Sequence, residues 1–240
     1  MNYNWDWGIL IESPYLDWIL SGLAWTLLVA SAAWVIAFMV GSIVGILRTV
    51  ENRVLRTLAT AYVELFRGIP LLVQLFLWFY VFPIVAPGPI GNWLIHDMPA
   101  PEYWTAVFAL GLYTASRVAE QVRSGINSLS TDLGNAGLAI GLTPMQTYLH
   151  VRLPLAYRII IPPLTTEFLT IFKNSSLALT IGLLELTAQA HRIESYTFHG
   201  FEAFTVATVL YLVITLIVVL FMRMIERRTE LGGTAGGGGR

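Results

Sequence analysis

Residues 133–156 read LGNAGLAIGLTPMQTYLHVRLPLA, and this moderately polar stretch inside an otherwise apolar chain is its most informative feature. Gly141 favours a left-handed cap at the end of one helix, and Thr143–Pro144 favours the N-cap and first turn of the next. Pro154 discourages helical geometry in the residue before it, which predicts the end of the second helix there. Small residues would let another protein approach the backbone of this helix-turn-helix: Ala136, Gly137 and Gly141.

The composition is that of a membrane protein. Hydrophobic residues make up 56% of the 240 residues and charged residues 12%, against the roughly 25% charged of soluble domains. The net charge of -1 and the two arginines near the helix-turn-helix argue against nucleic-acid binding, which needs a concentrated basic face. The absence of Cys excludes disulfides and thiol catalysis. The first residues have no basic n-region, so we expect no cleavable signal peptide.

Three stretches contain no charged residue and reach the ~20 apolar residues that a bilayer requires: they lie between Asp17 and Arg48, between Arg67 and Asp97, and between Glu202 and Arg223. Two weaker candidates carry charged residues, which in a membrane usually face a bundle interior or a polar cavity. We therefore predict an all-α integral membrane protein with spans at about 18–47, 66–90, 103–124, 159–190 and 203–224.

The arginines predict the orientation of these spans, because cytoplasmic loops are enriched in basic residues. Arginines follow the first, third and fifth spans: Arg48, Arg53, Arg56, Arg123, Arg152, Arg158, Arg223, Arg227 and Arg228. The alternate loops, 87–102 and 191–203, contain together only Arg192. We predict an external interfacial segment at 1–17, a transmembrane domain at 18–228 and a flexible cytoplasmic tail at 229–240. The N-terminus is then outside and the helix-turn-helix is in the cytoplasm.

The segment 132–154 resembles the EAA loop by which membrane subunits of ABC importers grip their ATPases. That pattern reads Glu-Ala-Ala, then Gly after three residues, and Leu-Pro about a dozen residues later; here it appears as Asn135-Ala136-Gly137, Gly141 and Leu153-Pro154. Asn135 replaces the acidic residue, so a hydrogen bond rather than a salt bridge is expected there. The alternative is a plain surface helix-turn-helix between two spans.

Three further motifs resemble the permease subunits of polar amino-acid ABC importers, over about residues 15–228. The run YVELFRGIPLLVQL, residues 62–75, contains Glu64, Arg67, Gly68 and Pro70; AEQVRSGINSL contains Glu120; and FKNSSLALTIGLLEL begins with Phe172 and contains Lys173, Asn174, Ser175 and Ser176. The resemblance implies a five-span type I ABC importer permease fold with a cytoplasmic coupling helix-turn-helix. The N-W-x-W-G-I run at residues 4–9 is similar to the openings of glutamate/aspartate importer permeases.

The resemblance implies a non-catalytic subunit of the bacterial inner membrane. The one lysine, Lys173, lies in IFKNSS without the glycines of a Walker A loop, so ATP and Mg²⁺ belong to partners. The implied partners are two ATP-binding cassette ATPases, a second identical or similar permease, a periplasmic amino-acid-binding protein and the lipid bilayer. The acidic residue missing at Asn135 suggests that the second permease differs from this one. We expect no metal site, because the histidines lack ligand spacing.

Arg117 is the sharpest candidate for substrate contact, because its fork of donors suits a carboxylate. We expect it to line the translocation cavity, with Glu120 on the same substrate path, and to favour glutamate or aspartate. The alternative is that it only pairs with Glu120 or Glu167. The polar run Lys173–Ser176 would either donate to a substrate carboxylate or hydrogen-bond between helices. We expect Glu64 and Arg67, beside Pro70, at the cytoplasmic end of the second span, as an inner gate or, more simply, a structural interface.

The resemblance implies a permease driven by ATP through alternating access, in which the loop 132–154 carries the motion of the ATPases to the spans. Within this class the alternative substrate is another polar amino acid, such as glutamine. A different class would be an ion-coupled secondary transporter that uses Glu120, Glu167 and Lys173 as a proton relay. A structural scaffold without a pore is the third reading, although it gives no reason for the charged residues within the spans.

Overall fold

The computed structural model describes residues 3–229, and over that range it consists of helices and their connections without a strand. This confirms the prediction of an all-α protein. The helices are η1 (Gly8–Ile11), α1 (Tyr15–Leu47), α2 (Arg53–Gly68), α3 (Leu71–Phe76), η2 (Leu77–Val81), α4 (Phe82–Val85), α5 (Gly88–Asn92), η3 (Trp93–Asp97), α6 (Pro101–Asn127), α7 (Thr131–Ala139), α8 (Pro144–Thr147), η4 (Tyr148–Arg152), α9 (Leu153–Asn174), η5 (Ser175–Ile181), α10 (Leu186–Thr197) and α11 (Gly200–Thr229).

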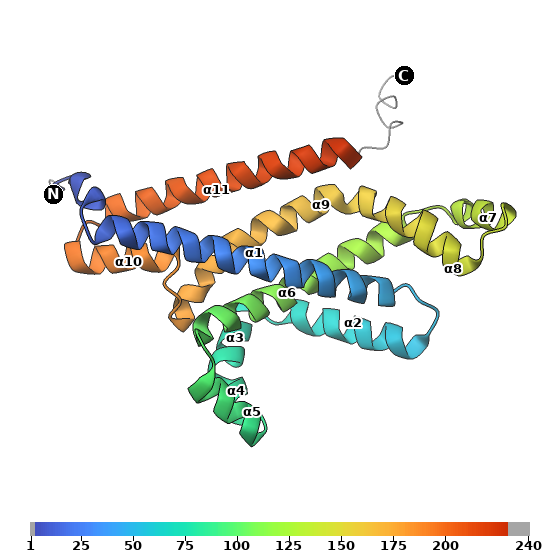
Figure 1. Cartoon of the computed structure of the whole chain (residues 1–240), viewed down its shortest axis with the longest axis horizontal. Helices are drawn as coiled ribbons and strands as arrows, with labels where there is room; N and C mark the ends of the chain where they lie inside the picture. Colours follow the sequence, from blue (N-terminus) through green and yellow to red (C-terminus); the bar gives the residue numbers. More distant parts are fainter. Residues whose placement is uncertain (1–2, 230–240) are drawn as a thin grey trace.

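The long helices α1, α6, α9 and α11 form an elongated bundle (Figure 1). Helix α10 and the N-terminal segment lie at one end of it, and α7 and α8 project from the opposite end. The short helices α3, α4 and α5 leave the side of the bundle. The bundle therefore has two distinct ends, one with α10 and one with α7 and α8, and the long helices run between them.

Small residues hold α1 against α6. The buried face of α1 carries a small side chain at nearly every fourth position. Gly22 and Thr26 meet Leu186 at the start of α10, and the stripe continues with Ala30, Ala33, Ala37, Gly41 and Gly45. A Cβ atom built on Gly41 would lie 2.6 Å from Cβ of Val118, and one built on Gly45 would lie 2.6 Å from Cβ of Val122. Such small-residue stripes let backbones approach closely in lipid, where association depends on packing rather than on the hydrophobic effect.

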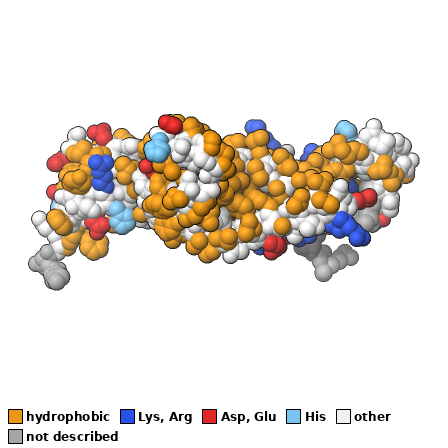
Figure 2. Space-filling view, turned by 90° about the horizontal axis from the view of Figure 1, so that it is seen from below, with side chains coloured by type: hydrophobic (Ala, Val, Ile, Leu, Met, Phe, Trp, Pro, Cys, Tyr) orange, Lys and Arg blue, Asp and Glu red, His pale blue; other side chains and the backbone are white. Residues whose placement is uncertain are grey.

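The outer surface of the bundle is apolar along its middle. Hydrophobic side chains dominate the central part of the face in Figure 2, and charged side chains gather toward its two ends. Within residues 3–229, three helices are long and apolar enough to cross a membrane: Tyr15–Leu47, Pro144–Ile181 and Gly200–Thr229. The bent pair Arg53–Gly68 and Leu71–Val85 raises the number to four. Helix α6 is 27 residues long, and it carries the charges that weakened the third predicted span.

The predicted span 66–90 is not one straight helix. Helix α2 ends at Gly68, and the chain turns by 102° before α3. Pro70 favours extended geometry in Ile69, which has φ -102° and ψ 128°. The turn frees two backbone carbonyls, and Nε2 of the buried Gln74 donates to both, to Phe66 at 2.8 Å and to Ile69 at 2.9 Å. Gln74 therefore supplies the hydrogen-bond donors that these two carbonyls need and that lipid cannot provide.

The prediction that Pro154 ends a helix is wrong. The chain stays helical from Pro144 to Ile181. The wider π-helical turn η4, in which the N–H of Leu153 donates to the carbonyl of Tyr148, leads into Pro154 near the start of α9. A π-turn accommodates the residue that a regular α-helix cannot, because proline clashes with the carbonyl four residues before it.

The predicted span 159–190 is also divided. The helical run that begins as α9 ends after η5, at Gly182, whose φ of 92° lies in the left-handed region that favours glycine. Helix α10 then starts afresh, because the carboxylate of Glu185 accepts hydrogen bonds from the N–H groups of Thr187 and Ala188. The predicted tail 229–240 lies outside the described residues except for Thr229.

We expect Gly41→Ala to lower the thermal stability of the detergent-solubilised protein, because overpacking a tight contact costs about 1–3 kcal/mol. Gly88→Ala is the matched control, since a Cβ atom at Gly88 meets nothing within 4 Å. Equal unfolding temperatures for the two variants would contradict close α1–α6 packing.

Candidate functional site

The helix-turn-helix at the projecting end forms as its sequence predicts. Gly141 has φ +88° after α7, and Thr143 begins α8 with a capping box. The N–H of Thr143 donates to Oε1 of Gln146 at 2.9 Å, and the N–H of Gln146 donates to Oγ1 of Thr143 at 3.3 Å. These reciprocal bonds satisfy two donors that a helix start leaves free. The corner between α7 and α8 is thus held by local chemistry.

The small residues of this corner divide into two roles. Gly137 is buried, and a Cβ atom on it would lie 2.6 Å from Cγ2 of Thr147. It therefore serves the packing of α7 on α8, and it does not open the surface to a partner as we expected. Asn135 and Ala136 are exposed, as are Gly141 and Pro154, while Leu153 is half-buried. The outward surface also exposes large apolar side chains: Leu138, Ile140, Met145 and Leu149.

The helix-turn-helix touches the end of α1. The hydroxyl groups of Tyr148 and Thr49 lie 2.8 Å apart, and Thr49 lies two residues after the end of α1. Between these elements lies a cavity of about 730 Å³, whose wall includes Ile46, Glu51, Asn135 and Met145. A displacement of α8 and η4 would therefore reach α1 through a direct contact.

One carboxylate organises the charged interior near this end. Glu120 on α6 binds Arg48 at the end of α1 and Arg123 one turn further along α6, and Arg67 of α2 lies 3.8 Å away. The side chain of Arg48 is 8% exposed. Glu120 thus joins three helices, and its negative charge is shared by three arginines. Our prediction that it lies on a substrate path stays a prediction.

Arg117 pairs with Glu167 and not with Glu120. Its Nε donates to Oε2 of Glu167 at 2.6 Å, between α6 and α9. The Glu167 side chain is 6% exposed, whereas that of Arg117 is 40% exposed. The carboxylate of the pair is therefore buried, whereas the arginine side chain is partly exposed. The sequence left Glu120 and Glu167 as alternatives, and the structure selects Glu167.

The polar run at the end of α9 is largely satisfied by its own helix. The hydroxyl of the buried Ser175 donates to the Phe172 carbonyl at 2.7 Å, and that of Ser176 donates to the Lys173 carbonyl at 2.8 Å. Asn174 is half-buried and Lys173 is exposed, so Lys173 is the residue of this run whose charge is exposed.

The predicted gate residues near the bend after α2 are also exposed: Glu64, Arg67, Gly68 and Pro70.

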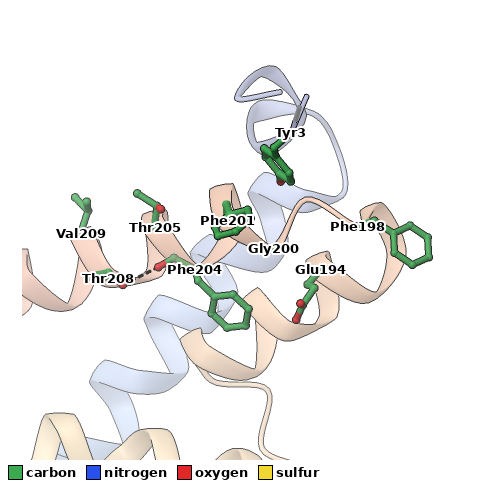
Figure 3. A pocket seen from close by; sticks show the side chains of 9 residues that line it. All are labelled: Tyr3, Glu194, Phe198, Gly200, Phe201, Phe204, Thr205, Thr208 and Val209. Atoms are coloured by element: carbon green, nitrogen blue, oxygen red, sulfur yellow. Dashed lines mark hydrogen bonds between the residues drawn. The ribbon is translucent and has the colours of Figure 1, made fainter. Parts of the chain in front are cut away.

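The opposite end of the bundle carries residues that the sequence did not single out. The buried Glu202, at the start of α11, accepts hydrogen bonds from the Tyr3 hydroxyl and from the N–H of Asp6 at 2.9 Å. A cavity of about 470 Å³ lies beside it, lined mainly by aromatic and small side chains that include Phe198, Phe201 and Phe204 (Figure 3). The N-terminal segment is thereby tied to the junction of α10 and α11.

Buried Glu185 is a second such residue. It caps α10 and also accepts a hydrogen bond of 2.7 Å from the hydroxyl of Tyr211 on α11. The carboxylates of Glu185 and Glu202 are not distinguished from surface acids by any spacing in the sequence. A hydrophobic residue directly after each glutamate is a feature that the two share in the sequence, but it is too common to identify a buried carboxylate.

Comparison with known proteins places this geometry in a family. Residues 37–231 match the model described as "Binding-protein-dependent transport system inner membrane component". The chain is 45% identical to the glutamate/aspartate import permease protein GltJ of Escherichia coli, covering 99% of this chain and 100% of that one. It is 28% identical to the glutamine transport system permease protein GlnP of Escherichia coli, covering 94% and 98%.

A solved structure agrees with these matches. The crystal structure of an amino acid ABC transporter with histidines has a chain that superposes with a TM-score of 0.80 at 28% identity, covering 94% of this chain and 100% of that one. This similarity and the family match confirm the predicted type I ABC importer permease fold.

We expect Glu120→Gln to lower the thermal unfolding temperature, because it leaves the buried Arg48 guanidinium without its carboxylate, and a buried charged donor that loses its partner costs about 1–3 kcal/mol. Glu64→Gln is the control, since Glu64 is exposed and forms no ion pair within residues 3–229. If both variants unfold at the wild-type temperature, the three arginines do not depend on Glu120.

Proposed function

Because the chain belongs to the family of inner membrane components of binding-protein-dependent transport systems, we propose that it forms the membrane path of an ATP-driven importer for glutamate or aspartate. The full-length similarity to a glutamate/aspartate import permease carries this proposal. The glutamine permease is a more distant relative. The chain provides the path for the substrate and transmits the motion of the ATPases to that path. A separate subunit hydrolyses ATP.

The partners follow from the two ends of the bundle. The projecting α7 and α8 expose an apolar surface with Asn135 and Ala136 beside it, which suits an ATPase in the cytoplasm. A periplasmic amino-acid-binding protein would meet the end that carries α10. The pore needs a second permease, identical or similar, and two ATPases. This arrangement puts the N-terminus outside and the C-terminus in the cytoplasm, as the arginines favour.

The mechanism requires the two ends to communicate. ATP closes the ATPases on each other, α7 and α8 move with them, and the contact between Tyr148 and Thr49 passes the motion to α1. The bundle then opens outward to the loaded binding protein, and hydrolysis returns it to the inward-open state. This cycle needs only that ATP binds one conformation more tightly than the other.

The half-exposed guanidinium of Arg117 gives the path its preference for acidic substrates. Its Nε is held by buried Glu167, which fixes the orientation of the guanidinium plane. The open side of a fixed guanidinium is a bidentate donor for a carboxylate. Lys173, exposed at the end of α9, is a second positive charge that a substrate carboxylate could meet. The side-chain carboxylate of glutamate or aspartate would therefore be favoured over a neutral amide.

To test this role, we would replace Arg117 and Glu167 together, as Arg117→Tyr with Glu167→Gln, so that no buried charge is left without a partner. We expect uptake of glutamate and aspartate by the reconstituted transporter to fall about tenfold or more, since a hydrogen bond to a charged group contributes about 1.5–3 kcal/mol. Uptake of glutamine should be retained or gained.

Arg223→Gln is the control for loss of one positive charge, because Arg223 is exposed on α11. Unchanged acidic uptake in the double variant would mean that the Arg117–Glu167 pair is structural only. Loss of all transport, with the complex still assembled and hydrolysing ATP, would point to a general role in the pathway rather than to substrate preference.

The proposed docking of the ATPase has its own test. Ile140 is 78% exposed at the tip of the helix-turn-helix, so Ile140→Asp should not disturb folding. We expect it to abolish copurification of the ATPase, because a charge would be buried in an apolar contact. Ile140→Leu should retain copurification. Normal ATPase recovery with Ile140→Asp would place the docking surface elsewhere.

A further inference from the structure

A second polar cavity lies where α1, α2 and α6 meet, at the same end of the bundle as α7 and α8. Its volume is about 480 Å³, and its wall consists of Arg48, Arg56, Thr57, Thr60, Ala61 and Arg123. We call it the arginine cleft. No acidic side chain is part of this wall.

The cleft has more positive charge than its surroundings neutralise. Arg48 and Arg123 share the single carboxylate of Glu120, which also attracts Arg67. Arg56 forms no ion pair with any residue between 3 and 229. An anion in the cleft would therefore be attracted by guanidinium groups that still carry excess charge.

A buried donor adds an independent observation. The side chain of Arg48 is more than nine-tenths buried, and its Nε has no hydrogen-bond partner in the described structure. A buried donor without a partner costs about 1–3 kcal/mol. Arg48 is also part of the wall of the cleft, and the hydroxyls of Thr57 and Thr60 on the same wall offer further donors to an oxygen atom that enters it.

The position of the cleft indicates which anion it meets. Helix α1 has 33 residues and is therefore about 50 Å long, longer than the ~30 Å hydrocarbon core of a bilayer. Arg48 follows its last residue, which brings the cleft to the level of lipid headgroups. Helix α2 also exposes Val54, Leu58 and Leu65, so apolar side chains that suit acyl chains lie on the helix that supplies Arg56.

We propose that the arginine cleft binds the phosphate group of an anionic phospholipid in the leaflet on the side of α7 and α8. Basic pockets between membrane helices on the cytoplasmic side recognise such headgroups. The phosphate accepts hydrogen bonds from Arg56, Arg123 and the threonine hydroxyls, and it relieves the charge excess around Glu120. The bound lipid joins α1, α2 and α6 beside the residue that contacts Tyr148. This proposal does not depend on the substrate.

The test compares lipid occupancy of the intact, purified transporter by native mass spectrometry. Cardiolipin and phosphatidylglycerol are added at equal concentrations to wild type and to Arg56→Gln, with phosphatidylcholine as the zwitterionic reference. We expect Arg56→Gln to lower the apparent affinity for the anionic lipids about fivefold, which corresponds to the ~1 kcal/mol that one basic residue contributes near an anionic surface.

Arg53→Gln is the matched control, because Arg53 is exposed on the same helix, loses the same charge, and does not line the cleft. Its anionic-lipid affinity should stay within about twofold of wild type, as expected for a loss of general surface charge that is screened by salt. Equal losses in the two variants would overturn the proposal, because they would show diffuse attraction rather than a site.

A second arm separates a lipid from a free anion. Inorganic phosphate is added during the lipid titration, and Thr57→Ala with Thr60→Ala removes the hydroxyl donors without changing the charge. Weaker lipid binding in the threonine variant, with little competition by millimolar phosphate, supports a lipid site. Phosphate that binds in an Arg56-dependent manner, while anionic lipid does not, would overturn the lipid assignment.

Discussion

The close contact of α1 with α6 fixes the positions of the residues that meet at the end of α1. Lipid provides no hydrophobic force between helices, so the contact must come from packing and from interhelical hydrogen bonds. The glycines of α1 at positions 41 and 45 leave no room for a Cβ atom against Val118 and Val122. Residues at the end of α1 consequently have fixed neighbours on α6, and charged groups can meet there with defined geometry.

Two functional contacts follow from this packing. Arg48 follows α1 directly and reaches Glu120, which also receives Arg123 and attracts Arg67. Thr49, the next residue, reaches Tyr148 next to the projecting helix-turn-helix. The projecting helix-turn-helix and the charged interior therefore contact two adjacent residues, Arg48 and Thr49, directly after the end of α1. The coupling that we propose between α8 and the ion-pair cluster would use this short connection.

Helix ends and turns were predictable from the sequence, whereas contacts between residues far apart in the sequence were not. The positive φ of Gly141 and the cap at Thr143 follow from the preferences of those residues, and the apolar composition required helices in a membrane. Pro154 was misjudged because the π-turn before it depends on the packing of the whole segment. Gly137 was assigned to a partner because a sequence cannot show that Thr147 covers it. The choice of Glu167 for Arg117 and the capping of the α2–α3 bend by Gln74 likewise depend on tertiary neighbours.

The cost of an unpaired charge in a membrane also explains which charged side chains are buried with a partner and which are exposed. An ionisable group within a membrane protein is expensive unless it has a partner, and Glu120, Glu167 and Glu185 all have one. Arg117 is the partner of buried Glu167, yet its side chain is still 40% exposed, and Arg56 forms no ion pair within residues 3–229. Both guanidinium groups therefore keep donors that a ligand can reach. We propose a transported carboxylate as the ligand of Arg117, which lies beside Glu167 between α6 and α9, and a lipid phosphate as the ligand of Arg56, which lies on α2 in the same cleft as Arg48.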